Sequence, residues 1–429
     1  MNKIFTAALA AAALGFCLHR ASAATYAVEH NFCTKANCPD GSEPDAAPIA
    51  DTAGNYYGTT IHGGSKDSGT IYRMSFNGTV WKEAVIHSFC LKTDCADGNA
   101  PQGGLVIDTA GNLYGMTTGG GYNDSGVVYE LSPNGAKWTY TILYKFCKNM
   151  SCPDGQHPYY ASLSYQGAAT GAAYDGTSPL YGTTQMGGAN GGGVVFQLTP
   201  SGGTWTESTV HDFCALANCI DGGLPFAGVT VDGSGNIFGA ATLGGVGEAE
   251  DCCGVLFELK HGAHWTYTSL HNFCTDVIGE VCLDGQGPIG APMLDAMGNI
   301  YGTTGLGGSH NEGTVYKVVP NGDKSKLTTL YNFCPKTNCP DGALPWAGAL
   351  AMDASGTLYG TASQGGSGGG TIFSLGGPKL NKFKALVVLK GSNGADPQGG
   401  LVLDPSGVLY GVAPAGGKGS QGVFFQLTP

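Results

Sequence analysis

The sequence has few charged residues, and its lysines and arginines form no cluster. Only 12% of its 429 residues are charged, against roughly a quarter in ordinary globular proteins. The formal net charge is −12. A chain with this charge and no basic patch is not expected to bind nucleic acid or an anionic membrane surface, because both attract clustered Lys and Arg.

Sequence motifs of common enzyme classes are also missing. No H-E-x-x-H motif occurs, so the sequence gives no sign of that class of zinc site. The chain has 73 glycines, but they fall between predicted strands. They do not lead from a strand into a helix, as phosphate-binding and dinucleotide-binding loops do. The sequence alone therefore predicts no reaction.

Long apolar runs are absent after the N-terminus. Lys3 is followed by an apolar run over residues 4–18 and then by Ala-Ser-Ala, which ends at Ala23. This order predicts a secretory signal peptide at residues 1–23, cleaved near Ala23. The run is too short for a transmembrane helix. We therefore expect a secreted or periplasmic protein without membrane insertion.

Cysteine, by contrast, is plentiful and closely spaced. Apart from Cys17 in the predicted signal peptide, fourteen cysteines remain, and twelve form local pairs in a recurring F-C-x4-C frame. The pairs are Cys33/Cys38, Cys90/Cys95, Cys147/Cys152, Cys214/Cys219, Cys274/Cys282 and Cys334/Cys339. Regular spacing in an exported chain predicts disulfides; metal binding is the alternative, although each pair offers only two thiolates. The adjacent Cys252 and Cys253 are predicted to form a seventh disulfide, with two unpaired thiols as the alternative.

The main feature of the chain is a motif that occurs seven times, D-x-x-G-N-x-Y-G-T-T-x-x-G-G-x(n)-G-[TV]-[VI]-[YF]. Its aromatic marker falls at Tyr57, Tyr114, Tyr181, Phe238, Tyr301, Tyr359 and Tyr410. A repeat of this length cannot bury its apolar face alone, so the copies must pack against one another. The predicted repeats span residues 39–95, 96–152, 153–219, 220–282, 283–339, 340–393, and 394–429 together with 24–38.

Each repeat contains four short predicted strands. In the second repeat these strands cover residues 102–108, 113–118, 126–131 and 138–146. The side chains Trp138, Tyr140, Ile142, Tyr144 and Phe146 are expected on one face of the fourth strand by period-two alternation. Four antiparallel strands per repeat predict an all-β fold, a single seven-bladed β-propeller over residues 24–429.

The two ends of the chain indicate how the ring closes. The seventh repeat stops after three strands, and residues 26–33 match the fourth strand of the first repeat at residues 84–90. We therefore predict that the N-terminal strand completes the last blade. The alternative, a linear solenoid, would be expected to carry polar caps at both ends, and neither end has one.

The repeat core resembles a known family. The segments Tyr57–Gly64 and Tyr301–Gly308 follow Y-G-T-T-x-x-G-G, which resembles the GloVer-type tandem repeat of bacterial exported proteins. The resemblance covers essentially the whole chain after the predicted signal peptide. It implies a repeat scaffold without an established activity. Members of the family often end in a surface-anchoring segment, whereas residues 425–429 here are predicted to lie within a blade.

One face of the predicted propeller carries the variable loops. The cysteine loops, which join strand 4 to the next strand 1, and the Gly-Gly loops between strands 2 and 3 should gather at one mouth of the channel. The residue after the cysteine-loop proline varies most, and its seven members are Asp45, Gln102, Tyr159, Phe226, Ile289, Trp346 and Gln398. Aromatic faces beside polar groups suit a sugar or a peptide. The alternative is that these aromatics only plug the channel.

Residues that recur in most repeats are predicted to be structural. One strand-4 position holds His30, His87, His211 and His271, and we expect interblade packing there. An Asp-Gly pair recurs in the cysteine loop at Asp40, Asp97, Asp154, Asp221, Asp284 and Asp341, with Asn393 in the seventh repeat. A turn is the expected role; a carboxylate ring around a central cation is the alternative.

Two further places break the symmetry. The Gly-Gly loop of the fourth repeat carries Glu248, Glu250 and Asp251, which could hold Ca²⁺; a rigid acidic surface loop is the alternative. An insertion at residues 166–177 of the third repeat is predicted to be a longer loop on the opposite face. No other cofactor is predicted.

Together these features predict an exported, monomeric binding protein that engages a glycan or a peptide on the face of the cysteine loops. The alternative is a secreted propeller enzyme, a Ca²⁺-supported polysaccharide lyase or hydrolase.

Overall fold

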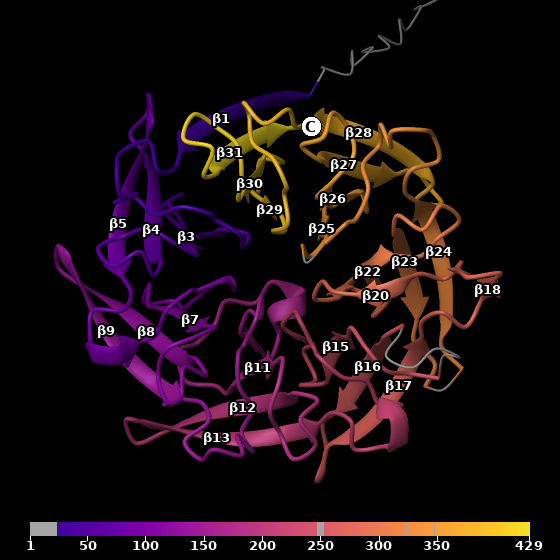
Figure 1. Cartoon of the computed structure of the whole chain (residues 1–429), viewed down its shortest axis with the longest axis horizontal. Helices are drawn as coiled ribbons and strands as arrows, with labels where there is room; N and C mark the ends of the chain where they lie inside the picture. Colours follow the sequence, from indigo (N-terminus) through magenta and orange to yellow (C-terminus); the bar gives the residue numbers. More distant parts are fainter. Residues whose placement is uncertain (1–23, 247–252, 323, 347) are drawn as a thin grey trace, which may run out of the picture.

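The protein is a ring of seven antiparallel β-sheets, which stand as blades around a central channel (Figure 1). The computed structural model describes residues 24–246, 253–322, 324–346 and 348–429. The predicted all-β, seven-bladed propeller is confirmed. No helix in the described part of the chain is long and apolar enough to cross a membrane.

Six blades have four strands and blade 5 has five, with the first strand nearest the channel and the last at the outside (Figure 1). Blade 1 comprises β2 (Ile49–Ala50), β3 (Tyr56–Thr60), β4 (Thr70–Phe76) and β5 (Trp81–Ser88). Blade 2 comprises β6 (Val106–Ile107), β7 (Leu113–Thr117), β8 (Val127–Asn134) and β9 (Lys137–Lys145). Blade 3 comprises β10 (Ser164–Tyr165), β11 (Leu180–Thr184), β12 (Val194–Ser201) and β13 (Thr204–Asp212). Blade 4 comprises β14 (Thr230–Val231), β15 (Ile237–Ala241), β16 (Val255–Lys260) and β17 (Thr266–Asn272).

The remaining blades follow the same plan. Blade 5 comprises β20 (Gln286–Pro288) and β21 (Met293–Leu294), which both pair with β22 (Ile300–Leu306), then β23 (Thr314–Val319) and β24 (Lys326–Asn332). Blade 6 comprises β25 (Ala351–Met352), β26 (Leu358–Ala362), β27 (Thr371–Gly376) and β28 (Lys382–Val388). Blade 7 comprises β29 (Val402–Leu403), β30 (Leu409–Ala413), β31 (Val423–Thr428) and β1 (Thr25–Asn31). The loops contain the 3-10 turns η1 (Thr93–Cys95), η2 (Ala168–Thr170) and η3 (Ala217–Cys219), and the small hairpin β18 (Val277–Ile278) and β19 (Val281–Cys282).

The ring is closed by the N-terminal strand, as predicted. β1 pairs antiparallel with β31, from Thr25 opposite Thr428 to Asn31 opposite Val423. The Tyr26 hydroxyl donates a hydrogen bond of 2.7 Å to the backbone oxygen of Asn393. The two ends of the chain therefore share one sheet, and no blade is left with an open fourth position.

The same backbone hydrogen bond joins the blades at all seven junctions. The residue before each cysteine-loop proline donates its N–H to the end of the preceding blade's Gly-Gly loop, over 2.9–3.0 Å. At the closing junction this bond runs from Glu43 to Gln421, and between blades 1 and 2 it runs from Ala100 to Ser68. The closing junction is thus built like the other six.

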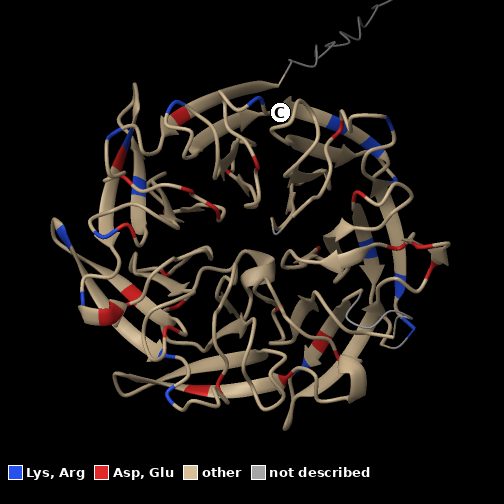
Figure 2. Cartoon of the chain, in the orientation of Figure 1, with Lys and Arg blue, Asp and Glu red and all other residues tan. Residues whose placement is uncertain are grey.

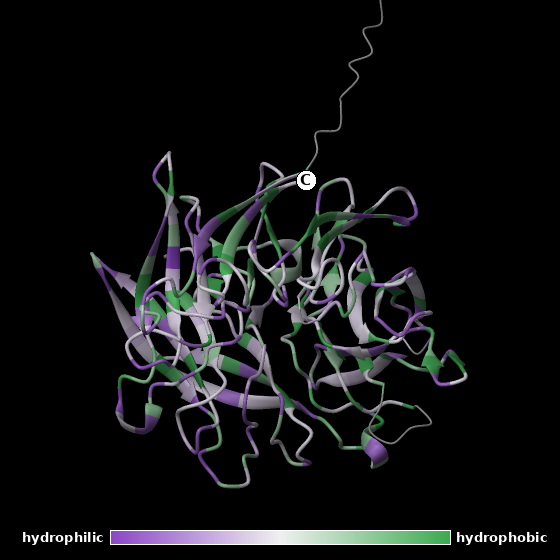
Figure 3. Ribbon diagram, turned by 45° about the horizontal axis from the view of Figure 1, so that its top comes forward, coloured by the Kyte–Doolittle hydropathy of each residue, from purple (hydrophilic) through white to green (hydrophobic). Residues whose placement is uncertain are grey.

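The apolar core lies between the blades, not inside them. Buried residues form seven clusters, one for each junction between adjacent blades. In Figure 3 the hydrophobic colour is concentrated on the strands, while the loops are mixed. This is the arrangement expected of a repeat whose units cannot bury their apolar faces alone.

The fourth strand differs from the prediction because of a β-bulge. Ile142 pairs with Tyr129, but the next pair is Tyr144 with Val128, so one residue of β9 has no opposite partner. Side chains before the bulge pack against blade 1, and those after it pack against blade 3. The prediction that residues 138–146 place their alternating side chains on one face is therefore wrong. The same register shift occurs in all seven sheets.

The first strand is shorter than predicted. In blade 2 the sequence predicts a strand over residues 102–108, but only β6 joins the sheet. The preceding residues run closely along blade 3, where a Cβ on Gly103 would overlap the carbonyl oxygen of Ala161. Crowding near the centre explains why small residues gather in these segments.

Candidate functional site

The cysteine loops and the Gly-Gly loops lie on one face of the ring, which we call the loop face. In blade 2, Gly121 of the Gly-Gly pair donates its N–H to the carbonyl oxygen of Cys95 over 3.1 Å. The corresponding bond occurs in every blade, with Gly391 in place of the cysteine in blade 7. The predicted grouping of these two kinds of loop on one face is confirmed.

Six disulfides join pairs of cysteines that both lie in the described residues, as predicted for the local cysteine pairs. They join Cys33 to Cys38, Cys90 to Cys95, Cys147 to Cys152, Cys214 to Cys219, Cys274 to Cys282 and Cys334 to Cys339. Each begins where the outermost strand of a blade ends. The expectation that the cysteines surround the channel mouth is therefore wrong. They brace the outer part of the loop face, and only the inner end of each loop reaches the channel.

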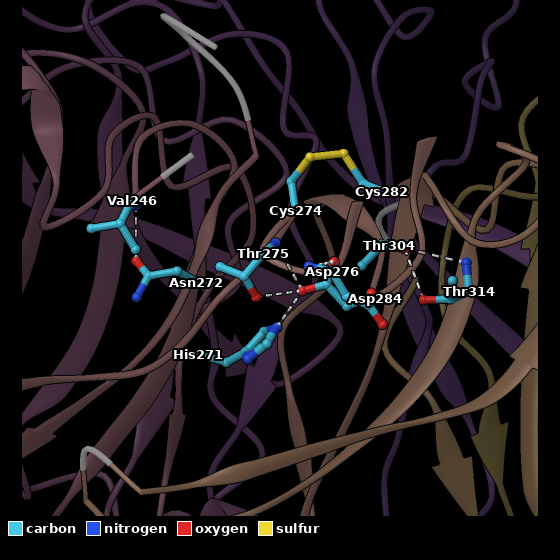
Figure 4. A network of polar contacts seen from close by, with 10 residues as sticks. All are labelled: Val246, His271, Asn272, Cys274, Thr275, Asp276, Cys282, Asp284, Thr304 and Thr314. Atoms are coloured by element: carbon cyan, nitrogen blue, oxygen red, sulfur yellow. Dashed lines mark hydrogen bonds and ion pairs between the residues drawn. A yellow bond between two sulfur atoms is a disulfide. The ribbon is translucent and has the colours of Figure 1, made fainter. Parts of the chain in front are cut away.

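The recurrent Asp-Gly carboxylates hold these loops in place. In blade 4, Asp284 accepts hydrogen bonds from His271 Nε2 at 3.0 Å, from the Thr275 hydroxyl at 3.0 Å and from two backbone N–H groups (Figure 4). Burial raises the pKa of Asp284, but the hydrogen bonds from His271 and Thr275 outweigh it and the net pKa is lowered. Equivalent bonds use the aspartates of the other cysteine loops. The turn interpretation is confirmed, and the alternative of a ring of carboxylates around a central cation is wrong.

Two of the strand-4 histidines, His87 and His211, pack between blades, as predicted, whereas His30 and His271 form hydrogen bonds with Asp40 and Asp284. His87 stacks on Tyr140 of the next blade with ring centroids 4.2 Å apart, and His211 stacks on Tyr267 at 4.5 Å. Burial lowers the pKa of His87 to about 4, and the charge of Asp97 only partly opposes this. A stacked, neutral imidazole in this position serves packing.

The seven residues after the loop prolines form a ring at the inner end of the loop face; we call them the mouth ring. The ring has two sides: blades 3 to 6 contribute Tyr159, Phe226, Ile289 and Trp346, and blades 7, 1 and 2 contribute Gln398, Asp45 and Gln102. Tyr159 and Phe226 meet edge to face, with centroids 5.6 Å apart. Tyr159, Phe226 and Trp346 are half-buried, whereas Ile289 is buried. An apolar arc of four consecutive blades thus faces a polar arc of three.

The polar arc borders a small cavity in the channel. The cavity has a volume of about 90 Å³, and its polar lining comprises Asp45, Gln102, Gln398, Tyr160 and Ser162. The Thr118 hydroxyl donates a hydrogen bond of 2.8 Å to Gln102 Oε1, and Gln398 Nε2 donates one of 2.8 Å to Asp396 Oδ2. These contacts fix both amides.

Tyr160 is a site residue that the sequence prediction missed. It follows Tyr159 at a position where the other blades have only Ala or Gly. Its backbone has a φ of 52°, which is unusual for a bulky residue. Its hydroxyl donates a hydrogen bond of 3.2 Å to Gln398 Oε1, so blade 3 reaches across the channel to blade 7. Aligning the second residue after each proline would have revealed it.

Asp45 is the most deeply buried ionisable group of the mouth ring, with 4% of its surface exposed. Burial raises the pKa of Asp45 to about 7, and the nearby charges of Asp396 and Glu43 add to the rise. Figure 2 shows acidic residues on the segments nearest the middle of the ring and no basic residue there. The polar arc is therefore electronegative.

Two other predicted features have different outcomes. Glu248, Glu250, Asp251 and Cys252 lie outside the described residues; Cys253 takes part in a disulfide bond.

The insertion at 166–177 is more than a longer loop. Gly167 donates its N–H to Asp232 O at 3.1 Å, and Tyr174 O accepts the N–H of Thr109 at 3.2 Å, so the insertion links blades 2 and 4 on the opposite face.

The fold and the disulfide-braced loop face define a repeat propeller. The chain belongs to the Gloeobacter/Verrucomicrobia repeat family, whose model matches residues 6–178 and 254–429. No curated protein matches the chain. The six disulfides indicate an extracellular or periplasmic protein, because such bonds persist in oxidising compartments.

Solved structures that match this chain have very different sequences. Polysaccharide lyase Uly1 is 10% identical with a TM-score of 0.50, and the match covers 90% of each chain. A candidate 6-phosphogluconolactonase from Bacteroides uniformis ATCC 8492 is 11% identical with a TM-score of 0.47, over 81% of this chain and 84% of that one. A candidate oxidoreductase (glucose dehydrogenase) from Thermus thermophilus is 14% identical with a TM-score of 0.40, over 76% and 96%. At such identities the likeness shows the fold alone.

Proposed function

We propose that the protein is an exported binding protein that engages a glycan or a peptide at the mouth ring. The observation that carries this proposal is the division of the ring into an apolar arc and a polar arc. Aromatic side chains opposite carboxyl and amide groups can stack on one side of a ligand and hydrogen-bond to its other side. A rigid ring that presents variable residues at a loop face is the usual design of a binding site.

The exposure of the aromatics supports a surface role. Tyr159, Phe226 and Trp346 are half-buried, and none of them belongs to the interblade clusters of the described residues. These three aromatics therefore contribute little to the interblade core, and their side chains are accessible to a ligand.

The shape of the channel limits how such a ligand binds. A cavity of about 90 Å³ has room for a small number of water molecules. Tyr160 also spans the channel to Gln398. We therefore expect the ligand to lie across the mouth or to insert only a small terminal group.

The alternative is a secreted polysaccharide lyase or hydrolase that uses Ca²⁺. Such an enzyme needs acid and base groups that a sugar can reach. In the mouth ring Asp45 and its neighbour Tyr160 are the ionisable groups next to the cavity, and Asp45 is buried, with 4% of its surface exposed. Binding is therefore the function that the geometry supports better. Secretion or periplasmic location after cleavage near Ala23, and a monomeric state, are part of the same proposal.

A binding screen against immobilised glycans and peptides tests the proposal. Any ligand found is titrated into the wild-type protein, into Trp346→Ala and into the matched control Phe76→Ala. Phe76 is an aromatic residue 52% exposed at the end of β4, away from the mouth ring. We expect Trp346→Ala to lose roughly 1–3 kcal/mol of affinity, as the loss of a stacked aromatic does, and Phe76→Ala to bind like wild type. Equal affinity of all three proteins would contradict the proposal, and turnover of a glycan would favour the enzyme.

A further inference from the structure

One oxygen of the channel cavity has no partner. Asp45 Oδ1 is buried and accepts no hydrogen bond from any described residue. No lysine, arginine or histidine of the described chain forms an ion pair with this carboxyl group. A buried carboxylate oxygen without a partner is costly, since it has lost its hydration and gained no hydrogen bond in return. A ligand with positive charge would remove that cost.

Neighbouring residues add oxygen atoms and negative charge. Gln102 and Gln398 come from the blades on either side of Asp45, and all three line the same cavity. The carboxylate of Asp396 accepts a hydrogen bond from Gln398 Nε2. The other amide atom, Gln398 Oε1, accepts the hydrogen bond from the Tyr160 hydroxyl. Asp396 and Glu43 also lie close enough to Asp45 to act on its charge.

We propose that the channel cavity is a binding site for a single divalent cation of the Ca²⁺ class, with Asp45 as its charged ligand and Gln102 and Gln398 as amide-oxygen ligands. Ca²⁺ takes carboxylate, amide and water oxygens in flexible geometry. Mg²⁺ demands near-ideal octahedral geometry, which side chains from three blades do not offer as readily. A cavity of about 90 Å³ accommodates an ion with a small number of waters.

The site also gives a role to Tyr160. Tyr160 has a positive φ, and in this conformation its side chain reaches Gln398. Strained backbone of this kind is held by its surroundings and clusters at ligand sites. Tyr160 would orient Gln398 and close the cavity over the ion. The cation site shares the polar arc of the mouth ring with the proposed glycan or peptide site, but a titration with the metal alone tests it separately.

Calorimetric titration with CaCl₂ alone tests the site, on the full mature chain dialysed against a chelator. The wild type should bind one equivalent of Ca²⁺ and bind Mg²⁺ at least about tenfold more weakly. Asp45→Asn keeps the shape of the side chain but removes its charge, and should weaken Ca²⁺ binding by at least about tenfold, since the charge count of the ligands sets the affinity. Gln398→Met, which removes an amide oxygen and leaves the charge of Asp45 in place, should weaken Ca²⁺ binding severalfold. The control is Asp94→Asn, an exposed carboxyl in the same kind of loop with φ 54°, which Asn tolerates.

The melting temperature provides a second readout, because a ligand that binds only the folded state raises it. Ca²⁺ should raise the melting temperature of wild type and of Asp94→Asn, and should not raise that of Asp45→Asn. The proposal is overturned if the wild type binds no Ca²⁺, or if Asp45→Asn binds it as tightly as wild type. It is also overturned if the combined variant Glu248→Gln, Glu250→Gln and Asp251→Asn loses the ion while Asp45→Asn retains it, which would place the cation in that loop.

Discussion

Glycine before the third strand of each blade should be irreplaceable because its own blade and the next blade together leave it no room. In blade 2, Gly126 has a φ of 96°, and a Cβ there would overlap the backbone oxygen of Thr117 in the same blade and lie 2.8 Å from Pro158 Cδ of the following cysteine loop. The same contact recurs at all seven junctions, where a Cβ on this glycine would meet the Cδ of the next loop proline. Gly111 in the same blade is a matched control: its φ is 85°, and the nearest atom to a Cβ is 3.9 Å away.

The two substitutions separate backbone strain from the steric clash with Thr117 and Pro158. Gly111→Ala should cost about 1–2 kcal/mol, the price of a left-handed conformation for a residue with a Cβ. Gly126→Ala carries the same strain and adds an overpacking cost of about 1–3 kcal/mol. With an unfolding entropy of about 2.1 cal/mol/K per residue, a ring of about 400 residues loses roughly 1 °C per kcal/mol. Scanning calorimetry should therefore show Gly126→Ala melting about 1–4 °C below Gly111→Ala. Equal melting temperatures would refute the idea that the loop proline dictates this glycine.

Three further predictions follow from ring closure, the disulfides and one buried carboxyl group. Removal of residues 24–33 should expose the edge of β31 and cause aggregation, and a truncated chain that stays monomeric with an unchanged melting temperature would contradict closure. Mass spectrometry of the unreduced protein should show within-loop disulfides and no free thiol; links between blades would contradict this. Burial raises the pKa of Glu207 to about 7, and Asp154 adds to the rise. Glu207 ionises at a lower pH in the unfolded state than in the folded state, so the free energy of unfolding should fall as pH rises from about 4.5 to 7. Glu207→Gln should flatten this part of the profile of unfolding free energy against pH, measured by urea denaturation. An unchanged profile would show that Glu207 is not responsible.

Much of the fold can be predicted from the sequence because every blade repeats the same local chemistry. The aspartate of the D-x-x-G-N turn, for example Asp51, accepts two backbone N–H groups, the Asn55 amide and the Tyr57 hydroxyl. The glycine after the tyrosine leaves room for an aromatic ring of the third strand, as Gly115 does for Tyr129. Such contacts stay within one repeat, so seven copies of the motif suffice to predict seven blades.

Features that depend on a neighbouring blade were harder to predict. The bulge in the fourth strand changes which blade Tyr144 packs against, and simple alternation contains no sign of it. Tyr160 stands out only when blade 3 is compared with the other six, and its partner Gln398 is 238 positions away. The isolation of Asp45 Oδ1 results from the closed ring, because the residues around it come from blades at both ends of the chain.

The central claim is that the mouth ring is a surface for a ligand and does not plug the channel as part of the core. Scanning calorimetry of Tyr159→Ala, Phe226→Ala and Trp346→Ala tests it most directly, with Phe257→Ala as the core control because Phe257 is fully buried between blades 3 and 4. We predict that Phe257→Ala loses about 3–5 kcal/mol of stability. This corresponds to roughly 4–6 °C in a ring of this size, and each mouth-ring variant should stay within about 1–2 °C of wild type. If all three mouth-ring variants melt as early as Phe257→Ala, the aromatics are core residues and the proposed binding surface does not exist.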